Sequence, residues 1–177
     1  MPGPEVPPPA SDPEAALEEA RDAQRAFERT RRRHYPRAAW TTDACHEHIG
    51  RFCLHHDDDD GWAPEPDPRE VVVARDRLIA ILDSADRVLP GDRWLLGQRV
   101  RYRLEAERPG EAVTLASDCA ASTSWCEALR GFVLHGTGDH LGAELAFDRS
   151  LDAMTPEARC AWEDIGPLLS GRDASRY

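Results

Sequence analysis

The chain has 177 residues, 33 acidic and 22 basic side chains, and a net charge of −11. Lysine and asparagine are both missing, so every basic residue other than histidine is arginine. These absences exclude a Walker A motif, Schiff-base and pyridoxal-phosphate chemistry at a lysine, and N-glycosylation within the sequence. The negative charge argues against a nucleic-acid partner, which requires a basic surface.

The N-terminal region predicts a disordered lead followed by a helix. Residues 1–11 contain five prolines, which is typical of an extended, unpacked segment. Asp12-Pro13 then gives a capping residue and a proline at the first helical position, and we expect a helix over 12–33. Its apolar stripe is thin, and its last turn is basic. The chain contains no apolar run long enough to cross a membrane and no N-terminal signal peptide, so we expect no membrane insertion.

The segment 34–67 reads as irregular, apart from one short helical turn or strand over Ile49–Leu54. A loop of this length is unusual in a compact domain, so we expect a covalent or metal-mediated link to hold it in place. Thiols and imidazoles cluster within it, at Cys45, His46, His48, Cys53, His55 and His56. A Cys45–Cys53 disulfide, free thiols and a metal site are the alternatives. The spacing between the cysteines is not that of a structural zinc site, so we predict the disulfide, with no metal and no other cofactor.

Residues 68–169 carry the periodicity of amphipathic helices, and the fold class is predicted to be all-α. We expect helices over 68–89, from Asp92 to about 108, and over 111–119, 124–135, 139–153 and 156–165, followed by a polar tail at 170–177. Ser124 is the expected cap of the fourth of these helices. The fifth is expected to bury Leu141, Leu145, Leu151 and Met154.

A 34-residue period links Gly97 to Gly131. With Gly131 as the eighth residue of a unit, Ala143 and Phe147 fall where a helical hairpin needs a small residue and a gap-filling side chain. The chain resembles tetratricopeptide-repeat proteins, with a good repeat over Ser124–Pro156 and weaker units before it. Across most of 20–170 it also resembles the N-terminal repeat region of an uncharacterised family of high-GC bacteria. The resemblance implies stacked helical hairpins and, in longer relatives, an extracytoplasmic location.

The remaining cysteines suggest a second local disulfide. Cys119 and Cys126 flank a short loop between two predicted helices, so we predict that they are bridged. Cys160 is then left over and is expected to be a buried free thiol. Two local pairs are typical of an oxidising compartment, which favours a periplasmic or cell-envelope location, although no signal peptide is visible.

The repeat resemblance also implies a binding surface. In such repeats, residues of the first helix of each unit line a concave groove; here these are Trp94, Gln98, Arg101, Tyr102, Trp125, Phe132 and His135. Aromatic and arginine side chains dominate binding energy at interfaces. The alternative is that helix 12–33 covers Trp125 and Phe132.

No catalytic motif is present, so we predict a protein that is not an enzyme. The leading hypothesis is an interaction scaffold that binds a partner peptide or helix in the concave groove. The alternatives are a metal-binding or thiol-redox module centred on Cys45–His56, and a purely structural domain of a larger assembly.

Overall fold

The computed structural model describes residues 12–34, 45–49, 52–56, 66–169 and 171–176. The predicted all-α fold is confirmed, and the described residues also include one short β-hairpin. The predicted lead at 1–11 lies outside the described residues. The chain divides into two compact units, one from residues 1–34 and 67–154 and the other from residues 35–66 and 155–177.

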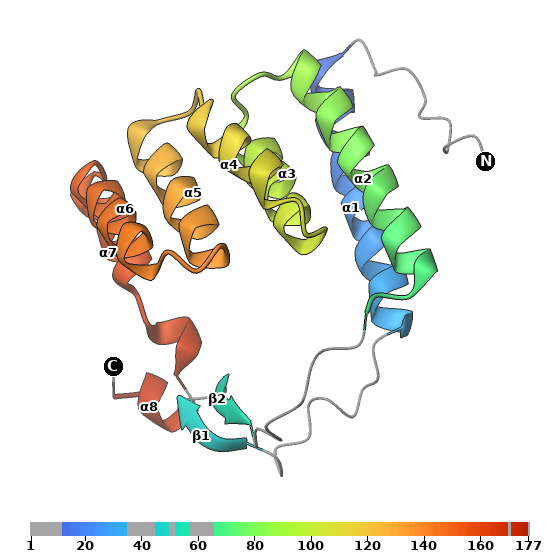
Figure 1. Ribbon diagram of the computed structural model, residues 1–177. Helices are drawn as coiled ribbons and strands as arrows, with labels where there is room; N and C mark the ends of the chain where they lie inside the picture. Colours follow the sequence, from blue (N-terminus) through green and yellow to red (C-terminus); the bar gives the residue numbers. More distant parts are fainter. Residues whose placement is uncertain (1–11, 35–44, 50–51, 57–65, 170, 177) are drawn as a thin grey trace. The chain divides into compact units, whose positions relative to one another are not determined.

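Three pairs of neighbouring helices make up the first unit (Figure 1). The pairs are α1 (Pro13–His34) with α2 (Arg69–Val88), α3 (Arg93–Glu105) with α4 (Pro109–Ser117), and α5 (Thr123–Gly136) with α6 (His140–Asp152). A short turn joins the two helices within the second pair and within the third. In contrast, α1 and α2 are separated in the sequence by the segment between His34 and Arg69. The N-terminal helix is nevertheless the partner of α2.

Side-chain caps begin several of these helices. The Asp92 carboxylate accepts from the Leu95 amide at 2.9 Å and so starts α3 where the sequence predicted. The helix after the Cys119 loop begins with Ser122, not with the predicted Ser124, because the Ser122 hydroxyl accepts from the Trp125 amide. Asp139 caps α6 in the same way.

The first hydrophobic core joins α1, α2 and α3. Its buried side chains are Ala16, Ala20, Phe27, Val71, Leu78, Ile79, Leu82, Ala85, Leu95 and Tyr102. A second core joins α3, α4 and α5 through Leu96, Val100, Ala112, Ala116, Leu129 and Val133. Because α3 contributes to both, it ties the first helix pair to the rest of the unit.

Buried arginines reinforce the boundary between α2 and α3. Arg103 is only 7% exposed, and it donates to Asp83 at 2.7 Å and to Glu111 of α4 at 2.9 Å. Arg99 donates to the same Asp83 at 2.8 Å and also pairs with Asp86. One carboxylate of α2 therefore holds two guanidiniums of α3.

Helices α5 and α6 form a pair, with Phe147 against Gly131 as expected, but the buried side of α6 differs from the prediction. The ring of Phe147 lies directly over Gly131, where an added side-chain carbon would stand 2.7 Å from it. Leu141 and Leu145, which we expected to be buried, are 69% and 51% exposed. The buried side chains of α6 are Ala143, Ala146 and Ser150. Small residues face α5 because the two helices approach closely, and the leucines fall on the opposite side.

The described residues of the second unit include a hairpin and three short helical segments. Strand β1 (Cys45–Ile49) pairs antiparallel with β2 (Phe52–His56), so the expected single short element is two strands. The helical segments are α7 (Pro156–Glu163), η3 (Gly166–Leu168) and α8 (Gly171–Ala174). Cys160 on α7 is exposed, so the prediction that it is buried is wrong. A short helix with no buried residue of its own gives the thiol nothing to pack against.

A disulfide joins Cys119 to Cys126, as predicted, with their Cα atoms 5.6 Å apart. It spans the turn between α4 and α5. The side chains of the hairpin strands lie outside the described part of the structure, so the Cys45–Cys53 disulfide stays a prediction. Among the described residues, no helix is long and apolar enough to cross a membrane.

Candidate interaction surface

We use the name first-helix face for the side of α1, α3 and α5, the first helices of the three pairs, that carries Gln24, Glu28, Trp94, Gln98, Arg101, Trp125, Phe132 and His135. Side-chain contacts on each successive turn connect α1 to α3: Arg21 with Trp94, Gln24 with Gln98, Glu28 with Tyr102, and Arg31 with Glu105. The partners are separated by a nearly constant 73 or 74 residues. A constant separation along two helices means that they run parallel and in register, so successive turns of α1 meet successive turns of α3.

The α3 residues predicted to line the groove have different environments. Gln98 accepts from the Gln24 amide at 3.0 Å, and Trp94 lies under the Arg21 guanidinium, 5.5 Å from the ring centroid. Arg101 is partly exposed and donates to Glu105 at 2.8 Å. Tyr102 is fully buried, so the prediction that its ring lines an open groove is wrong. Its ring packs edge-on against Phe27 of α1, the helix whose position the sequence did not predict.

Glu28 of α1 contacts three polar side chains at this face. Its carboxylate accepts from the Tyr102 hydroxyl at 2.9 Å and from Arg31 at 2.7 Å, and Arg101 lies 3.5 Å away. Burial raises the pKa of Tyr102 to about 12, and the hydrogen bond to Glu28 acts in the same direction. The phenol therefore stays neutral and donates its proton, while the charge of Glu28 is balanced by two guanidiniums.

The α5 part of the face carries aromatic side chains. Trp125 packs against Gly97 of α3, and its indole Nε1 is buried without a hydrogen-bond partner among the described residues. Phe132, two turns further along α5, is 42% exposed. His135 is exposed, and its ring lies 5.2 Å from that of His140. The hypothesis that the N-terminal helix covers Trp125 and Phe132 is wrong, because α1 packs on α2 and α3 instead.

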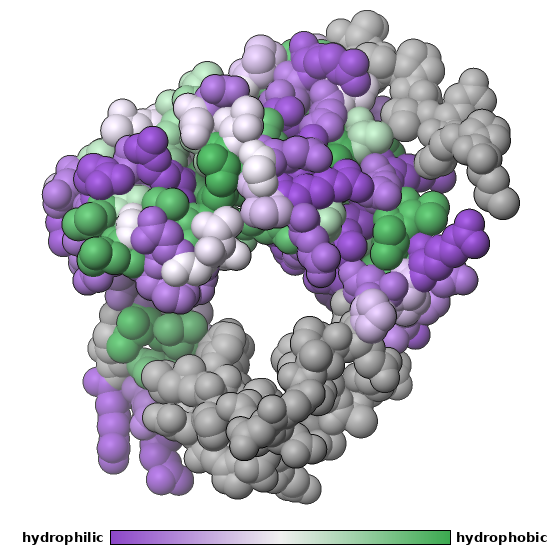
Figure 2. Space-filling view, viewed as in Figure 1, coloured by the Kyte–Doolittle hydropathy of each residue, from purple (hydrophilic) through white to green (hydrophobic). Residues whose placement is uncertain are grey.

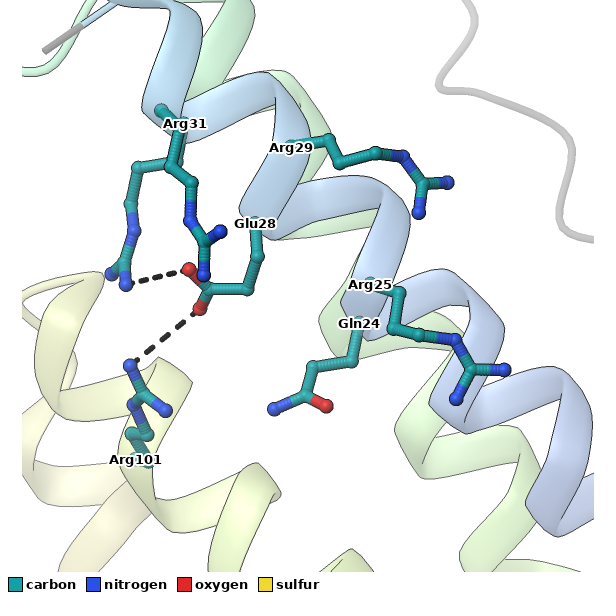
Figure 3. A pocket seen from close by; sticks show the side chains of 7 residues that line it. Gln24, Arg25, Glu28, Arg29, Arg31 and Arg101 are labelled. Atoms are coloured by element: carbon teal, nitrogen blue, oxygen red, sulfur yellow. Dashed lines mark hydrogen bonds and ion pairs between the residues drawn. The ribbon is translucent and has the colours of Figure 1, made fainter.

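A groove of about 560 Å³, which we call the arginine groove, opens between α1 and α3 (Figure 3). It is lined by Gln24, Arg25, Glu28, Arg29, Arg31, Arg32 and Arg101. Figure 3 shows Gln24 and Glu28 reaching towards α3, while Arg25 and Arg29 extend to the other side of α1. Hydrophilic residues also cover much of the helical surface seen in Figure 2. Five of the seven lining residues are arginines, on a protein whose net charge is negative, but the guanidiniums of Arg25 and Arg29 point away from the groove (Figure 3).

Sequence reasoning missed this groove because it treated the arginines at the end of α1 only as partners of the helix dipole. The available signal was their spacing. Arg25, Arg29 and Arg32 recur at i, i+4 and i+7, which places them on one side of the helix. The groove itself depends on the parallel register of α1 and α3, which brings Arg31 and Arg101 to the same Glu28 carboxylate and which no local pattern contains.

The described side chains contain no candidate metal centre. Within residues 12–34, 66–169 and 171–176, no three histidine, cysteine, aspartate or glutamate side chains converge on a common point. The Cys45–His56 cluster lies outside the described side chains, so the hypothesis of a metal or redox module is not tested there.

Comparison with models of protein families, with curated proteins and with solved structures finds no match to this chain.

Proposed function

We propose that this protein is a non-enzymatic interaction module that binds a segment of a partner protein along the first-helix face. The observation that carries the proposal is the partly exposed ring of Phe132, which continues the stripe of Trp125 on α5. Rigid aromatic side chains on a helical surface provide large contact area at little entropic cost.

The succession of three helix pairs supports this proposal. Gly131 receives the ring of Phe147, and Gly97, 34 residues earlier, receives the ring of Trp125. In both places a glycine on the first helix of a pair lets a large ring approach the helix backbone. Three helix pairs with parallel first helices are the arrangement that lets solenoids present a continuous surface to a partner.

The environment of Trp125 divides the face into a supporting part and a contacting part. Trp125 is held between α3 and α5 and so fixes the spacing of these helices. Phe132 and His135 reach solvent on the same stripe. We infer that a partner contacts the latter two residues, while Trp125 supports them.

Site-specific photo-crosslinking in cells of the source organism tests the proposal. A photoreactive amino acid replaces Phe132 in one variant and Val113 in a matched control. Val113 is 44% exposed on α4, the second helix of its pair, so the control presents an equally accessible apolar site away from the first-helix face. We expect a discrete crosslinked protein from position 132 that is absent from position 113. Equal products from both positions, or none from position 132, would contradict the proposal.

A further inference from the structure

The side of α1 next to the arginine groove carries positive charge that the described residues do not neutralise (Figure 3). Arg31 and Arg101 are committed to Glu28 and Glu105 at the α3 side of the groove. In contrast, Arg29 and Arg32 are exposed, and neither has an ion-pair or hydrogen-bond partner among the described residues. Two guanidiniums therefore face solvent with their donor groups unused.

A third guanidinium can be released to a ligand. Arg25 pairs with Asp22, three residues away on the same helix, and both side chains are more than half exposed. An exposed ion pair of this kind contributes little to stability and exchanges readily with solvent or another anion. The stripe of Arg25, Arg29 and Arg32 thus offers three adjacent positions for negatively charged groups along about two turns of α1.

We propose that the exposed stripe of Arg25, Arg29 and Arg32, beside the arginine groove, binds an acidic segment of a partner protein, whose carboxylates pair with Arg29 and Arg32. Guanidinium groups bind carboxylates through two parallel hydrogen bonds, and the planar fork of arginine suits this geometry better than a lysine ammonium does. The inference rests on the proposed function, because it assigns a chemical character to a segment of the partner protein that is proposed to bind there.

The distribution of charge favours a short acidic segment over a nucleic acid. The first half of α1 carries Glu14, Glu18, Glu19 and Asp22, directly beside the arginines. A nucleic acid has closely spaced phosphates and would extend from the arginine stripe onto these carboxylates. A short acidic peptide can end at the arginines and so avoids most of this repulsion.

The test uses fluorescence anisotropy with a blocked, labelled peptide of alternating aspartate and serine residues. The same peptide with asparagine in place of aspartate measures the contribution of charge, and a single-stranded DNA oligonucleotide serves as competitor. The double variant Arg29→Gln with Arg32→Gln removes the two unpaired groups. The matched control, Arg77→Gln with Arg87→Gln, removes two exposed arginines from α2. Circular dichroism checks that both variants fold.

We expect the acidic peptide to bind in a salt-sensitive manner and the asparagine peptide not to bind. The variant with Arg29→Gln and Arg32→Gln should bind the peptide with a dissociation constant about tenfold or more above that of the unmodified protein. The dissociation constant of the control variant should stay within about twofold of it. An equal loss in both variants would mean a general effect of net charge and would overturn the proposal. Displacement of the peptide by a lower concentration of DNA would overturn it in favour of a nucleic-acid ligand. If the peptide did not bind but a discrete crosslink formed at position 132, the acidic-segment proposal would be overturned and the proposed function would be retained.

Discussion

Gly131 of α5 provides a direct test of how closely the third helix pair is packed. Replacing glycine by alanine inside a helix normally stabilises a protein by up to about 1 kcal/mol, because glycine is the more flexible residue when unfolded. Here the added carbon would stand 2.7–2.9 Å from three atoms of the Phe147 ring. Real side chains avoid such distances, so the ring must shift. Overpacking of this kind costs roughly 1–3 kcal/mol. We therefore expect Gly131→Ala to lower the free energy of unfolding by about 1 kcal/mol.

The assay is chemical denaturation followed by circular dichroism, with Gly110→Ala as the control. Gly110 lies in α4 and has no atom within 4 Å of the position that a side-chain carbon would take, so this variant should be neutral or slightly stabilised. A double-mutant cycle isolates the contact. Phe147→Ala alone should cost about 3 kcal/mol, because the ring is half-buried, and Gly131→Ala should become stabilising in that background. If Gly131→Ala were as favourable as Gly110→Ala in the unmodified protein, the close approach of the two helices would be refuted.

Two further predictions concern buried polar groups. Tyr102 keeps its proton up to a pKa of about 12 when folded but only to about 10 when unfolded, so stability present below pH 10 should fall by about 2–3 kcal/mol as the pH rises towards 12. Denaturation of Tyr102→Phe measured over the same range should lack this fall, and the absence of lysine keeps the titration simple. Asp83→Ala should cost about 2–3 kcal/mol in thermal unfolding, because Arg99 and Arg103 share that carboxylate, whereas Asp22→Ala at an exposed pair should cost less than about 1 kcal/mol. Equal costs for the two aspartates would mean that the shared carboxylate contributes no more than a surface pair.

Local patterns in the sequence predicted the elements that depend on nearby residues. The helices, the Asp92 cap and the contact between Gly131 and Phe147 all follow from periodicity and spacing over short stretches of chain. The Cys119–Cys126 disulfide belongs to the same class, because its two ends flank a single turn.

Features that depend on distant segments could not be predicted in this way. Helices α1 and α2 pair although the whole segment between His34 and Arg69 separates them in the sequence, and the pattern of neither helix predicts which helix it packs against. That pairing decides that Tyr102 is buried and that Phe132 is open. The exposure of Leu141 and Leu145 has a similar origin, because an apolar stripe shows which side of a helix prefers to be covered but not whether a cover exists.

The two boundaries between successive helix pairs are held by different chemistry. Between the first and second pairs, ion pairs from carboxylates of α2 to arginines of α3 supplement the first hydrophobic core. Between the second and third pairs, the covalent bond from Cys119 to Cys126 supplements the second core, and a reducing agent opens it. Reduction should therefore loosen the boundary between the last two pairs, while the ion pairs at the boundary between the first two stay in place.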